Sequence, residues 1–292
     1  MKKALFVNGS YNEIPLIKAA HDLGYFVITS GNDSSGEGHK ISDKYIPCDY
    51  SKKEEIYKIA KDEKVDAICS CGNDFGALSA SFAAEKLGLK GHDSYEVSRI
   101  FHEKDQFKNL CNKLKLNTPR SFVFGDKKKA IAHIQNVKFP QIVKPNDLGG
   151  GKGMTVVNSF DEATKAIDKA FSASKSKIVL IEDYISGNQY GFSCFLINGK
   201  VIFNYLSRDL SYLNPYMVWT AIAFYEDEQR ELRTKIVKDV EKIARFTKMC
   251  DGMLTIQLIV KDGEPYYLET MRRCLGNMHY YCLSNDIGFD VF

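Results

Sequence analysis

The sequence predicts a chain of two parts, an α/β domain built on a parallel sheet followed by an α+β region of mainly antiparallel strands. Residues 1–100 alternate short apolar runs with amphipathic stretches of helical period, which is typical of a parallel sheet covered on both faces. From residue 121 onward, apolar strand-like runs follow one another, and Asn-Gly and Asp-Gly turns join two pairs of them as hairpins. The length of 292 residues agrees with about two domains.

The first part is expected to contain four strands alternating with three helices. The first and third helices end at glycines, Gly24 and Gly88, and Ser51 is the expected N-cap of the second. The predicted strands cover 3–9, 25–30, 44–50 and 65–72, and the predicted helices cover 13–24, 51–64 and 74–88.

Ligands of such a sheet bind beyond the carboxyl ends of the strands. Three of these ends carry short polar turns with a glycine, which are Asn8-Gly9-Ser10, Ser30-Gly31-Asn32 and Cys71-Gly72-Asn73-Asp74. No GxGxxG fingerprint opens the first helix, and a dinucleotide-binding domain is therefore disfavoured.

The second part begins with a connecting helix over 101–120, which an Asn-Thr-Pro sequence closes. The segment 207–219 has no clear period and is either a substrate loop or a packing loop. Strands are expected at 121–125, 141–145, 154–158, 177–185, 190–206 and 253–270, the last two as hairpins, with helices at 159–174 and 227–248.

Composition excludes several classes of function. The net charge is only +3, with acids and bases well mixed, which argues against a nucleic-acid partner. No apolar run approaches the roughly 20 residues of a membrane span, and the start lacks the apolar core of a signal peptide. The eight cysteines form no CxxC and no zinc-type Cys/His spacing. We therefore expect free thiols in a cytoplasmic protein.

The segment IVKPNDLGGGKGM, at 142–154, is the most informative stretch. It does not match the Walker pattern GxxxxGK[ST], and it leads from one predicted strand into another rather than into a helix. A glycine-rich hairpin of this kind can cover a phosphate chain with backbone N–H groups, and Lys144 on the preceding strand can reach the same phosphates. A flexible surface hairpin is the alternative, and the loop alone does not decide between them.

The order of motifs along nearly the whole chain resembles that of the ATP-grasp superfamily, which includes biotin carboxylase, carbamoyl phosphate synthetase and the purine-pathway ligases. Each motif alone has little specificity, whereas their shared order is specific. The motifs are KVDAICSCGNDFGALSASFAAEKLGLKG (64–91), HEKDQFKNLCNKLKLNTPRSF (102–122), IVKPNDLGGGKGM (142–154), VLIEDYISGNQYGFSC (179–194) and QLIVKDGEPYYLETMRRCLGN (257–277).

The resemblance implies a division into an N-terminal Rossmann-like domain at 1–100, a connecting helix at 101–120, a lid subdomain at 121–184 and a C-terminal subdomain at 185–292, the last two clasping ATP. ATP and Mg²⁺ are the implied cofactors. The resemblance assigns nucleotide-binding roles to Lys104, Lys144, Gly149, Gly150, Gly151, Lys152, Gly153, Glu182, Asp183, Tyr184, Ile185 and Gln189.

The last motif implies a metal site that departs from the family pattern. Glu269 matches a metal carboxylate, but Gln257 stands where a second carboxylate is expected and Met271 where an asparagine is expected. Magnesium prefers charged oxygen ligands, so Glu269 and Gln257 would contribute little, and ATP would bring the ion on its phosphates. Because neighbours in a strand face opposite ways, Arg273 rather than Arg272 is expected to steady the transferred phosphoryl group.

The implied function is an ATP-dependent ligase that activates a small carboxylate as an acyl phosphate for attack by an amine or another nucleophile. Lys144 and Arg273 are the expected catalytic residues, and the second substrate is expected between the strand ends of the first domain and Arg273. The alternative is a nucleotide-binding pseudoenzyme or sensor, which Gln257 and Met271 favour. The chain ends soon after DIGFDVF; a compact member, a truncated form and a homodimer all stay open.

Overall fold

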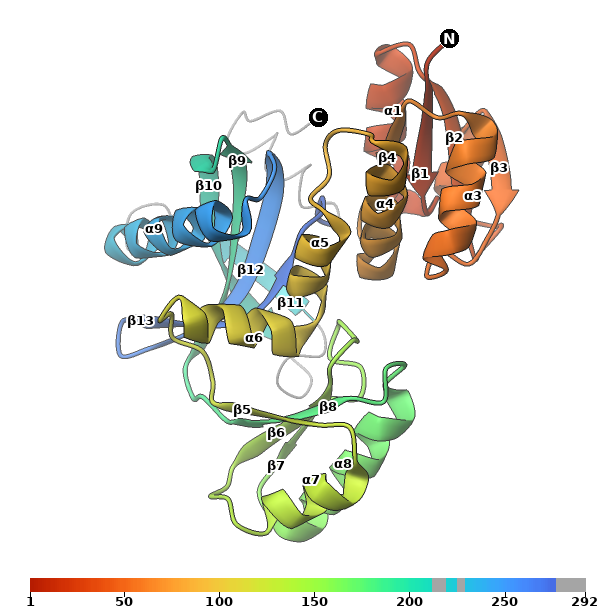
Figure 1. Cartoon of the computed structure of the whole chain (residues 1–292). Helices are drawn as coiled ribbons and strands as arrows, with labels where there is room; N and C mark the ends of the chain where they lie inside the picture. Colours follow the sequence, from red (N-terminus) through yellow and green to blue (C-terminus); the bar gives the residue numbers. More distant parts are fainter. Residues whose placement is uncertain (212–218, 225–228, 277–292) are drawn as a thin grey trace.

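The computed structural model describes residues 1–211, 219–224 and 229–276, with the side chains of 211 and 219–224 left aside. In this part of the chain the strands form three sheets (Figure 1). One is parallel, in the order β3-β2-β1-β4, and two are antiparallel, in the orders β5-β8-β6-β7 and β11-β10-β9-β12-β13. The predicted fold class is confirmed.

The parallel sheet is packed on both faces, because side chains of successive strand residues point in opposite directions. In β1, Leu5 and Val7 join the core cluster that contains α3 and α4, whereas Ala4 and Phe6 join the cluster that contains α1. The elements are β1 (Lys3–Val7), α1 (Ile14–Asp22), β2 (Phe26–Gly31), α2 (Glu37–Ile41), β3 (Lys44–Pro47), α3 (Lys53–Glu63), β4 (Ala67–Cys69) and α4 (Asp74–Leu87).

Two helix boundaries differ from the expected ones. The N-cap of α3 is Lys52, without a side-chain hydrogen bond, because both the backbone N–H and the hydroxyl of Ser51 donate to Asp49 instead. The expected N-cap role of Ser51 is therefore wrong. The segment 101–120 holds parts of two helices, α5 (Tyr95–His102) and α6 (Lys104–Lys113), which are separated at Glu103 because its backbone is extended.

The segment 121–184, which is the expected lid subdomain, forms a four-stranded antiparallel sheet with α7 and α8 covering one face (Figure 1). Its elements are β5 (Ser121–Phe124), α7 (Lys127–Ile134), β6 (Gln141–Pro145), β7 (Thr155–Val157), α8 (Phe160–Ala173) and β8 (Val179–Asp183). Strand β6 pairs with β7 in antiparallel register, Ile142 opposite Val156, so the glycine-rich segment is a strand–loop–strand hairpin, as predicted.

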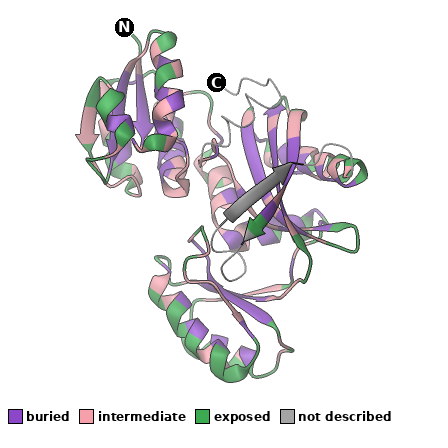
Figure 2. Cartoon of the chain, turned by 180° about the vertical axis from the view of Figure 1, so that it is seen from behind, coloured by how far each residue is buried: buried purple, intermediate pink, exposed green. Residues whose placement is uncertain are grey.

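The C-terminal sheet packs α6 and α9 against one face and leaves the other face to line a cavity. Even-numbered residues of β9 and β12 join the helices in the largest core cluster, Phe192 and Ile256 among them. Figure 2 shows the buried central strands. The elements are β9 (Asn188–Ile197), β10 (Lys200–Ser211), β11 (Trp219–Phe224), α9 (Arg230–Thr247), β12 (Gly252–Lys261) and β13 (Glu264–Met271).

A β-bulge in β13 determines which residues face the cavity. Gln257 lies opposite Glu269, but the next residue, Leu258, lies opposite Tyr267, so Leu268 is an extra residue in β13. Such a bulge reverses the alternation of side chains. Tyr267 therefore packs against the helices while Glu269 turns to the cavity.

The described ends of the segment 207–219 are strand rather than loop, since β10 runs to Ser211 and β11 begins at Trp219. Residues 212–218, within this segment, lie outside the described residues, as do the last sixteen positions, 277–292. None of the described helices is both long enough and apolar enough to cross a membrane.

Candidate active site

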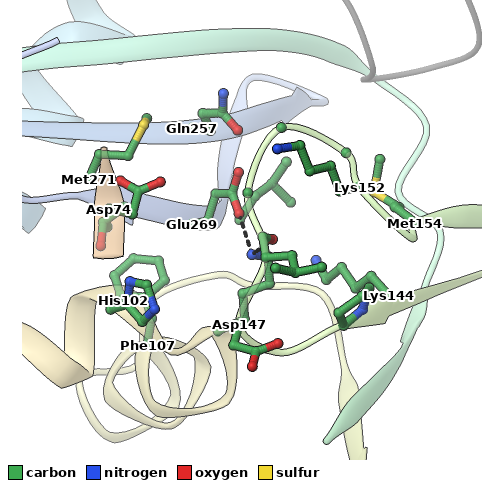
Figure 3. Close-up of a pocket in the computed structure, with 18 of the residues that line it drawn as sticks. Asp74, His102, Phe107, Lys144, Asp147, Lys152, Met154, Gln257, Glu269 and Met271 are labelled. Atoms are coloured by element: carbon green, nitrogen blue, oxygen red, sulfur yellow. Dashed lines mark hydrogen bonds and ion pairs between the residues drawn. The ribbon is translucent and has the colours of Figure 1, made fainter. Parts of the chain in front are cut away.

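A cavity of about 1100 Å³, hereafter the large cavity, lies where the N-terminal domain, the lid subdomain and the C-terminal sheet meet. It is lined from all three parts and from α6 (Figure 3). Of the residues singled out in the sequence, those that line it are Lys104, Lys144, Gly149, Gly150, Gly151, Lys152, Glu182, Asp183, Ile185, Gln189, Gln257, Glu269, Met271 and Arg273, whereas Gly153 and Tyr184 do not.

Lys144 of β6 and Lys108 of α6 approach one buried carboxylate, Glu182 of β8. The ammonium of Lys144 lies 2.7 Å from one oxygen of Glu182, and that of Lys108 lies 3.7 Å from the other. Glu182 is fully buried, and Lys108 also donates a hydrogen bond of 3.1 Å to the carbonyl of Tyr267. The carboxylate therefore links the lid subdomain to the connecting helix.

Sequence reasoning did not select Lys108. A signal existed, because Lys104 and Lys108 are four residues apart, which places both side chains on one face of a helix. Burial outweighs the attraction of Glu182 and lowers the pKa of Lys108 to about 8. Burial alone would raise the pKa of Glu182, but Lys108 and Lys144 together hold it below its ordinary value.

Lys104, at the start of α6, is held by the opposite wall of the large cavity. Its ammonium lies 2.9 Å from Glu269 of β13 and donates a hydrogen bond of 2.7 Å to the carbonyl of Leu148, just before the glycine loop. Burial opposes the ionisation of Glu269, yet Lys104 and then Lys144 lower its pKa below the ordinary value. Lys104 and Lys144 are thus both paired with carboxylates.

The adjacent residues Arg272 and Arg273 have different surroundings. The Nε of Arg272 donates to Asp93 at 2.8 Å, and its other nitrogens donate to the carbonyls of Cys250 and Met253. The Nε of Arg273 instead donates to Asp74, at the start of α4, at 2.6 Å. Of these two, only Arg273 lines the large cavity.

The glycine loop is a tight, left-handed segment beside the N-terminal domain. Gly150, Gly151 and Gly153 have φ of 65°, 69° and 75°, a region that other residues enter only with strain. A Cβ on Gly149 would lie 3.2 Å from Asp74. The loop therefore closes over the large cavity and reaches the helix that carries Asp74.

The base of the loop is fastened to α6 and α8. The amide of Asn146 donates to Asp105 at 2.8 Å, and Asp147 accepts from the hydroxyl of Ser174 at 3.1 Å and from the backbone of Ser176 at 2.6 Å. These bonds position the loop on regular structure rather than leaving it as a free surface hairpin.

Apolar side chains line the large cavity beside Glu182 and the strand that follows it; they are Phe107, Ile142, Ile185, Ile259 and Leu268. The carboxylate of Asp183 is engaged by Arg120 at 3.0 Å and by the amide of Gln141 at 3.0 Å. This part of the cavity therefore combines apolar walls with the end of a strand.

Gln189, on β9, lines the same cavity and lies beside Asp209 of β10. Asp209 is buried, which raises its pKa to about 6 although Ser207 and Gln189 donate hydrogen bonds that oppose the shift. Sequence reasoning did not select Asp209, because a single acid in an otherwise alternating strand carries no local signal.

The candidate metal ligands form a sparse oxygen set. Gln257 and Glu269 are register partners on β12 and β13, and both line the large cavity, as does the thioether of Met271. Within the described ranges, no group of three His, Cys, Asp or Glu side chains could hold a metal ion. One carboxylate and one amide oxygen fit a magnesium ion that arrives bound to phosphates, because Mg²⁺ commonly uses one or two protein oxygens and substrate oxygens.

The strand ends of the N-terminal domain contribute unequally. Gly72 and Asn73 line the large cavity, whereas Asn8, Gly9 and Ser10 line neither of the two cavities found in the described part of the chain. A Cβ on Gly9 would overlap the ring of His39. The turn after β1 is therefore packed against a buried side chain and not opened toward the site.

Comparisons with known proteins identify similar sequences and similar folds. Residues 102–214 match the family model described as phosphoribosylglycinamide synthetase, ATP-grasp (A) domain. The carbamoyl phosphate synthase large chain of Clostridium botulinum (strain Kyoto / Type A2) is 22% identical over 276 residues, which cover 92% of this chain and 26% of that protein. The chain thus spans about a quarter of the length of the curated relatives it matches.

Solved structures share the architecture. A phosphoribosylglycinamide synthetase from Anaerococcus prevotii superposes with a TM-score of 0.75 at 23% identity, over 97% of this chain and 71% of that one. An L-amino acid ligase from Bacillus licheniformis superposes with a TM-score of 0.79 at 18% identity, over 100% of this chain and 72% of that chain. A third structure is the biotin carboxylase domain dimer of a Hydrogenobacter thermophilus 2-oxoglutarate carboxylase, in complex with MgADP, ADP and bicarbonate. It superposes with a TM-score of 0.76 at 19% identity, over 99% of this chain and 67% of that chain.

Proposed function

Because this chain has the ATP-grasp fold and resembles ATP-grasp ligases along nearly its whole length, we propose that it is an ATP-dependent ligase. It activates a small carboxylate as an acyl phosphate, which an amine or another nucleophile then attacks. The observation that carries the proposal is the convergence of Lys104, Lys144, the glycine loop and Arg273 on one large cavity.

The nucleotide occupies the large cavity with its base between the apolar walls beside Glu182, Asp183, Tyr184 and Ile185. Its phosphates extend toward Lys104 and Lys144, beneath the N–H groups of the glycine loop. Gln189 is the proposed partner of the ribose hydroxyls. Charge-assisted hydrogen bonds from two ammonium groups to a polyanion are strong in a partly buried site, which supports this orientation.

Both lysines must exchange partners when the nucleotide binds. Phosphate oxygens replace Glu269 at Lys104 and compete with Glu182 at Lys144. Lys108 stays beside Glu182, so the buried carboxylate keeps one cation after Lys144 turns to the phosphates. This exchange supports phosphate binding without leaving an uncompensated buried charge.

Magnesium fits the site as an ion bound mainly by the nucleotide. Glu269, released by Lys104, and the amide oxygen of Gln257 are the proposed protein ligands. The ion would neutralise charge on the phosphates, which phosphoryl transfer requires.

The chemical step relies on positioning and charge. A carboxylate oxygen of the substrate forms a bond to the γ-phosphorus while the bond to the β–γ bridging oxygen breaks, giving ADP and an acyl phosphate. The nucleophile then forms a bond to the acyl carbon, and inorganic phosphate leaves. Arg273 steadies the transferred phosphoryl group, since preorganised cations contribute strongly where charge develops. Closure of the glycine loop keeps water from the acyl phosphate.

The proposal includes a cytoplasmic setting, in line with the free thiols of all seven described cysteines, and leaves a homodimer to be checked by light scattering. The central experiment follows ADP release from Mg-ATP in the presence of pools of carboxylic and amino acids, alongside calorimetric titration of a non-hydrolysable ATP analogue. Turnover dependent on one pool is the expected result. Analogue binding without turnover in any pool and without magnesium dependence would instead identify a pseudoenzyme.

A further inference from the structure

A second cavity of about 240 Å³, hereafter the small cavity, adjoins the large one between the N-terminal domain and the C-terminal sheet. Six residues line both cavities and form the wall between them: Asp74, Phe101, His102, Thr270, Met271 and Arg273. A molecule in the small cavity would therefore meet the proposed phosphoryl-transfer site across this wall.

The ion pair of Asp74 and Arg273 is the charged part of the shared wall. Arg273 donates from Nε to Asp74 at 2.6 Å and from a terminal nitrogen to the carbonyl of Cys274 at 3.1 Å. The arginine side chain is 9% exposed, whereas that of Asp74 is 36% exposed and lies beside Met271 in the close-up (Figure 3). Asp74 therefore presents a carboxylate to the cavities.

Helix capping does not explain Asp74. The N-cap of α4 is Asn73, whose side chain accepts a hydrogen bond of 2.9 Å from the backbone of Gly76. Among the described residues, Arg273 is the cation that forms an ion pair with Asp74. Lys104 is engaged by Glu269, and burial lowers the pKa of the nearby His102, which favours its neutral form.

The pair constrains the chemistry of the activated substrate. Arg273 donates from Nε to Asp74 and from one terminal nitrogen to the carbonyl of Cys274, so its further N–H groups can receive a substrate carboxylate next to Asp74. That carboxylate would share Arg273 with Asp74 and leave the charge of Asp74 less well compensated. A substrate that also carries an ammonium group would compensate Asp74 as its carboxylate compensates Arg273. Since the two protein groups are in direct contact, the two charges of the substrate must be close neighbours.

We infer that the carboxylate activated at this site belongs to an amino acid, with its ammonium group bound by Asp74, its carboxylate by Arg273 and its side chain in the small cavity. This inference rests on the proposed ligase function and names its substrate class. The small cavity corresponds to roughly eight water molecules at about 30 Å³ each, which is room for one such side chain and not for a nucleotide. Its lining combines apolar side chains, Leu16, Ile68 and Met253 among them, with polar and charged ones that include the paired Asp93 and Arg272.

The test uses the full chain saturated with a non-hydrolysable ATP analogue and magnesium. Each of the common L-amino acids is titrated by calorimetry, and each amino acid that binds is compared with its deamino analogue, which keeps the carboxylate and loses the ammonium group. The variants are Asp74→Asn, Asp74→Glu and the control Glu37→Gln, which breaks an exposed pair with Lys40. Thermal melting checks that each variant is folded.

At least one amino acid should bind, and its deamino analogue should bind at least about tenfold more weakly. Asp74→Asn should weaken the amino acid about tenfold but leave the deamino analogue unchanged or tighter, because Arg273 is then released. Asp74→Glu should bind the amino acid more tightly than Asp74→Asn does, and Glu37→Gln should match the wild type. If Asp74 only maintained the structure, Asp74→Asn would weaken the binding of the amino acid and of the deamino analogue alike.

Three results would overturn the inference: no amino acid binds at about 10 mM, the deamino analogue binds as well as the amino acid, or Asp74→Asn weakens both equally. If Asp74→Asn does not fold, the comparison of amino acid and deamino analogue on the wild type decides alone. Failure of the ATP analogue to bind would count against the ligase proposal, whereas normal analogue binding without amino-acid binding would count against this inference only.

Discussion

The ammonium of Lys104 and the carboxylate of Glu269 lie 2.9 Å apart and join the start of α6 to β13 across the large cavity (Figure 3). One proposed phosphate-binding group is thus held by one proposed magnesium ligand. A magnesium nucleotide supplies a new partner to each, anionic oxygens to the lysine and a cation to the carboxylate. Before binding, Lys104 and Glu269 therefore compensate each other's charge, and the magnesium nucleotide replaces both partners of this ion pair.

Lys144→Met should weaken the ATP analogue about tenfold or more, because a charge-assisted hydrogen bond to phosphate is lost in a partly buried site. Calorimetry at constant magnesium measures the change. The matched control is Lys127→Met, which removes an exposed lysine in the same subdomain that pairs with Asp168. Equal affinities for wild type and Lys144→Met would place the phosphates elsewhere.

Replacing each of the two neighbouring arginines separately should distinguish a residue that stabilises the fold from one that acts in turnover. Arg272→Gln should lower the free energy of unfolding by about 3 kcal/mol, since it leaves buried Asp93 and two carbonyls without their partner. Arg273→Gln should lower the rate of ADP release about 100-fold or more while ATP-analogue affinity stays near that of the wild type. Urea unfolding and turnover assays measure the two effects. The reverse pattern would mean that the two roles are interchanged.

Two glycines with the same left-handed backbone conformation provide a matched test of the glycine loop. Gly150 has φ of 65° and Gly88, at the end of α4, has φ of 67°, and a Cβ on either would meet nothing within 4 Å. Alanine at each position should cost about 1 kcal/mol of stability. Only Gly150→Ala should also slow turnover, because the loop must close over the phosphates. Equal turnover in the two variants would remove the loop from the mechanism.

The double variant Gln257→Glu, Met271→Asn should bind magnesium more tightly, because it adds a carboxylate and an amide oxygen next to Glu269. We expect the magnesium concentration at half-maximal analogue binding to fall at least about tenfold. Each single variant serves as a control for the contribution of its own ligand. An unchanged magnesium dependence would show that the metal lies away from these strands.

Glu13 should give the protein a distinctive pH dependence. It is fully buried, and burial raises its pKa from 4.5 to about 7, although Ser10 and Asn8 donate hydrogen bonds to it. A carboxyl group with a raised pKa binds more protons in the folded protein than in the unfolded one, so its stabilising contribution is fully present below about pH 4.5 and is lost as the pH rises through about 7.

The expected loss across that range is roughly 3 kcal/mol. Glu13→Gln cannot ionise, so relative to the wild type it should gain up to roughly that amount between pH 4.5 and 8. Urea unfolding of both proteins at several pH values measures the difference. Parallel stability curves would mean that Glu13 titrates near its ordinary value.

The sequence predicts the elements well wherever a local pattern governs them. The hairpin around the glycine loop follows from two apolar runs and a turn, and the alternating first domain follows from its period. The antiparallel second part follows from its strand-like runs and hairpin turns, whereas its assignment to the ATP-grasp fold depended on the order of motifs. By contrast, the break between α5 and α6 at Glu103 has no Pro or Gly to announce it.

Contacts between distant segments account for the parts of the site that sequence reasoning did not reach. Helical spacing places Lys108 on the same face as Lys104, and Asp74 follows a strand end, but their partners, Glu182 and Arg273, come from distant parts of the chain. The bulge at Leu268 decides which face Glu269 occupies, yet it depends on the register between β12 and β13. Such long-range pairings cannot be read from a period or a cap.

The short parallel bridge between Cys71 and Cys274, reinforced by a hydrogen bond of 3.2 Å from the backbone of Gly72 to the carbonyl of Cys274, ties the N-terminal domain directly to the end of the C-terminal sheet. The lid subdomain takes no part in this link. We therefore expect the proposed nucleotide site to open by movement of the segment 121–184 relative to the other two parts, which remain joined by this bridge. Under the proposed function, such a movement would release the used nucleotide while the second substrate stays bound.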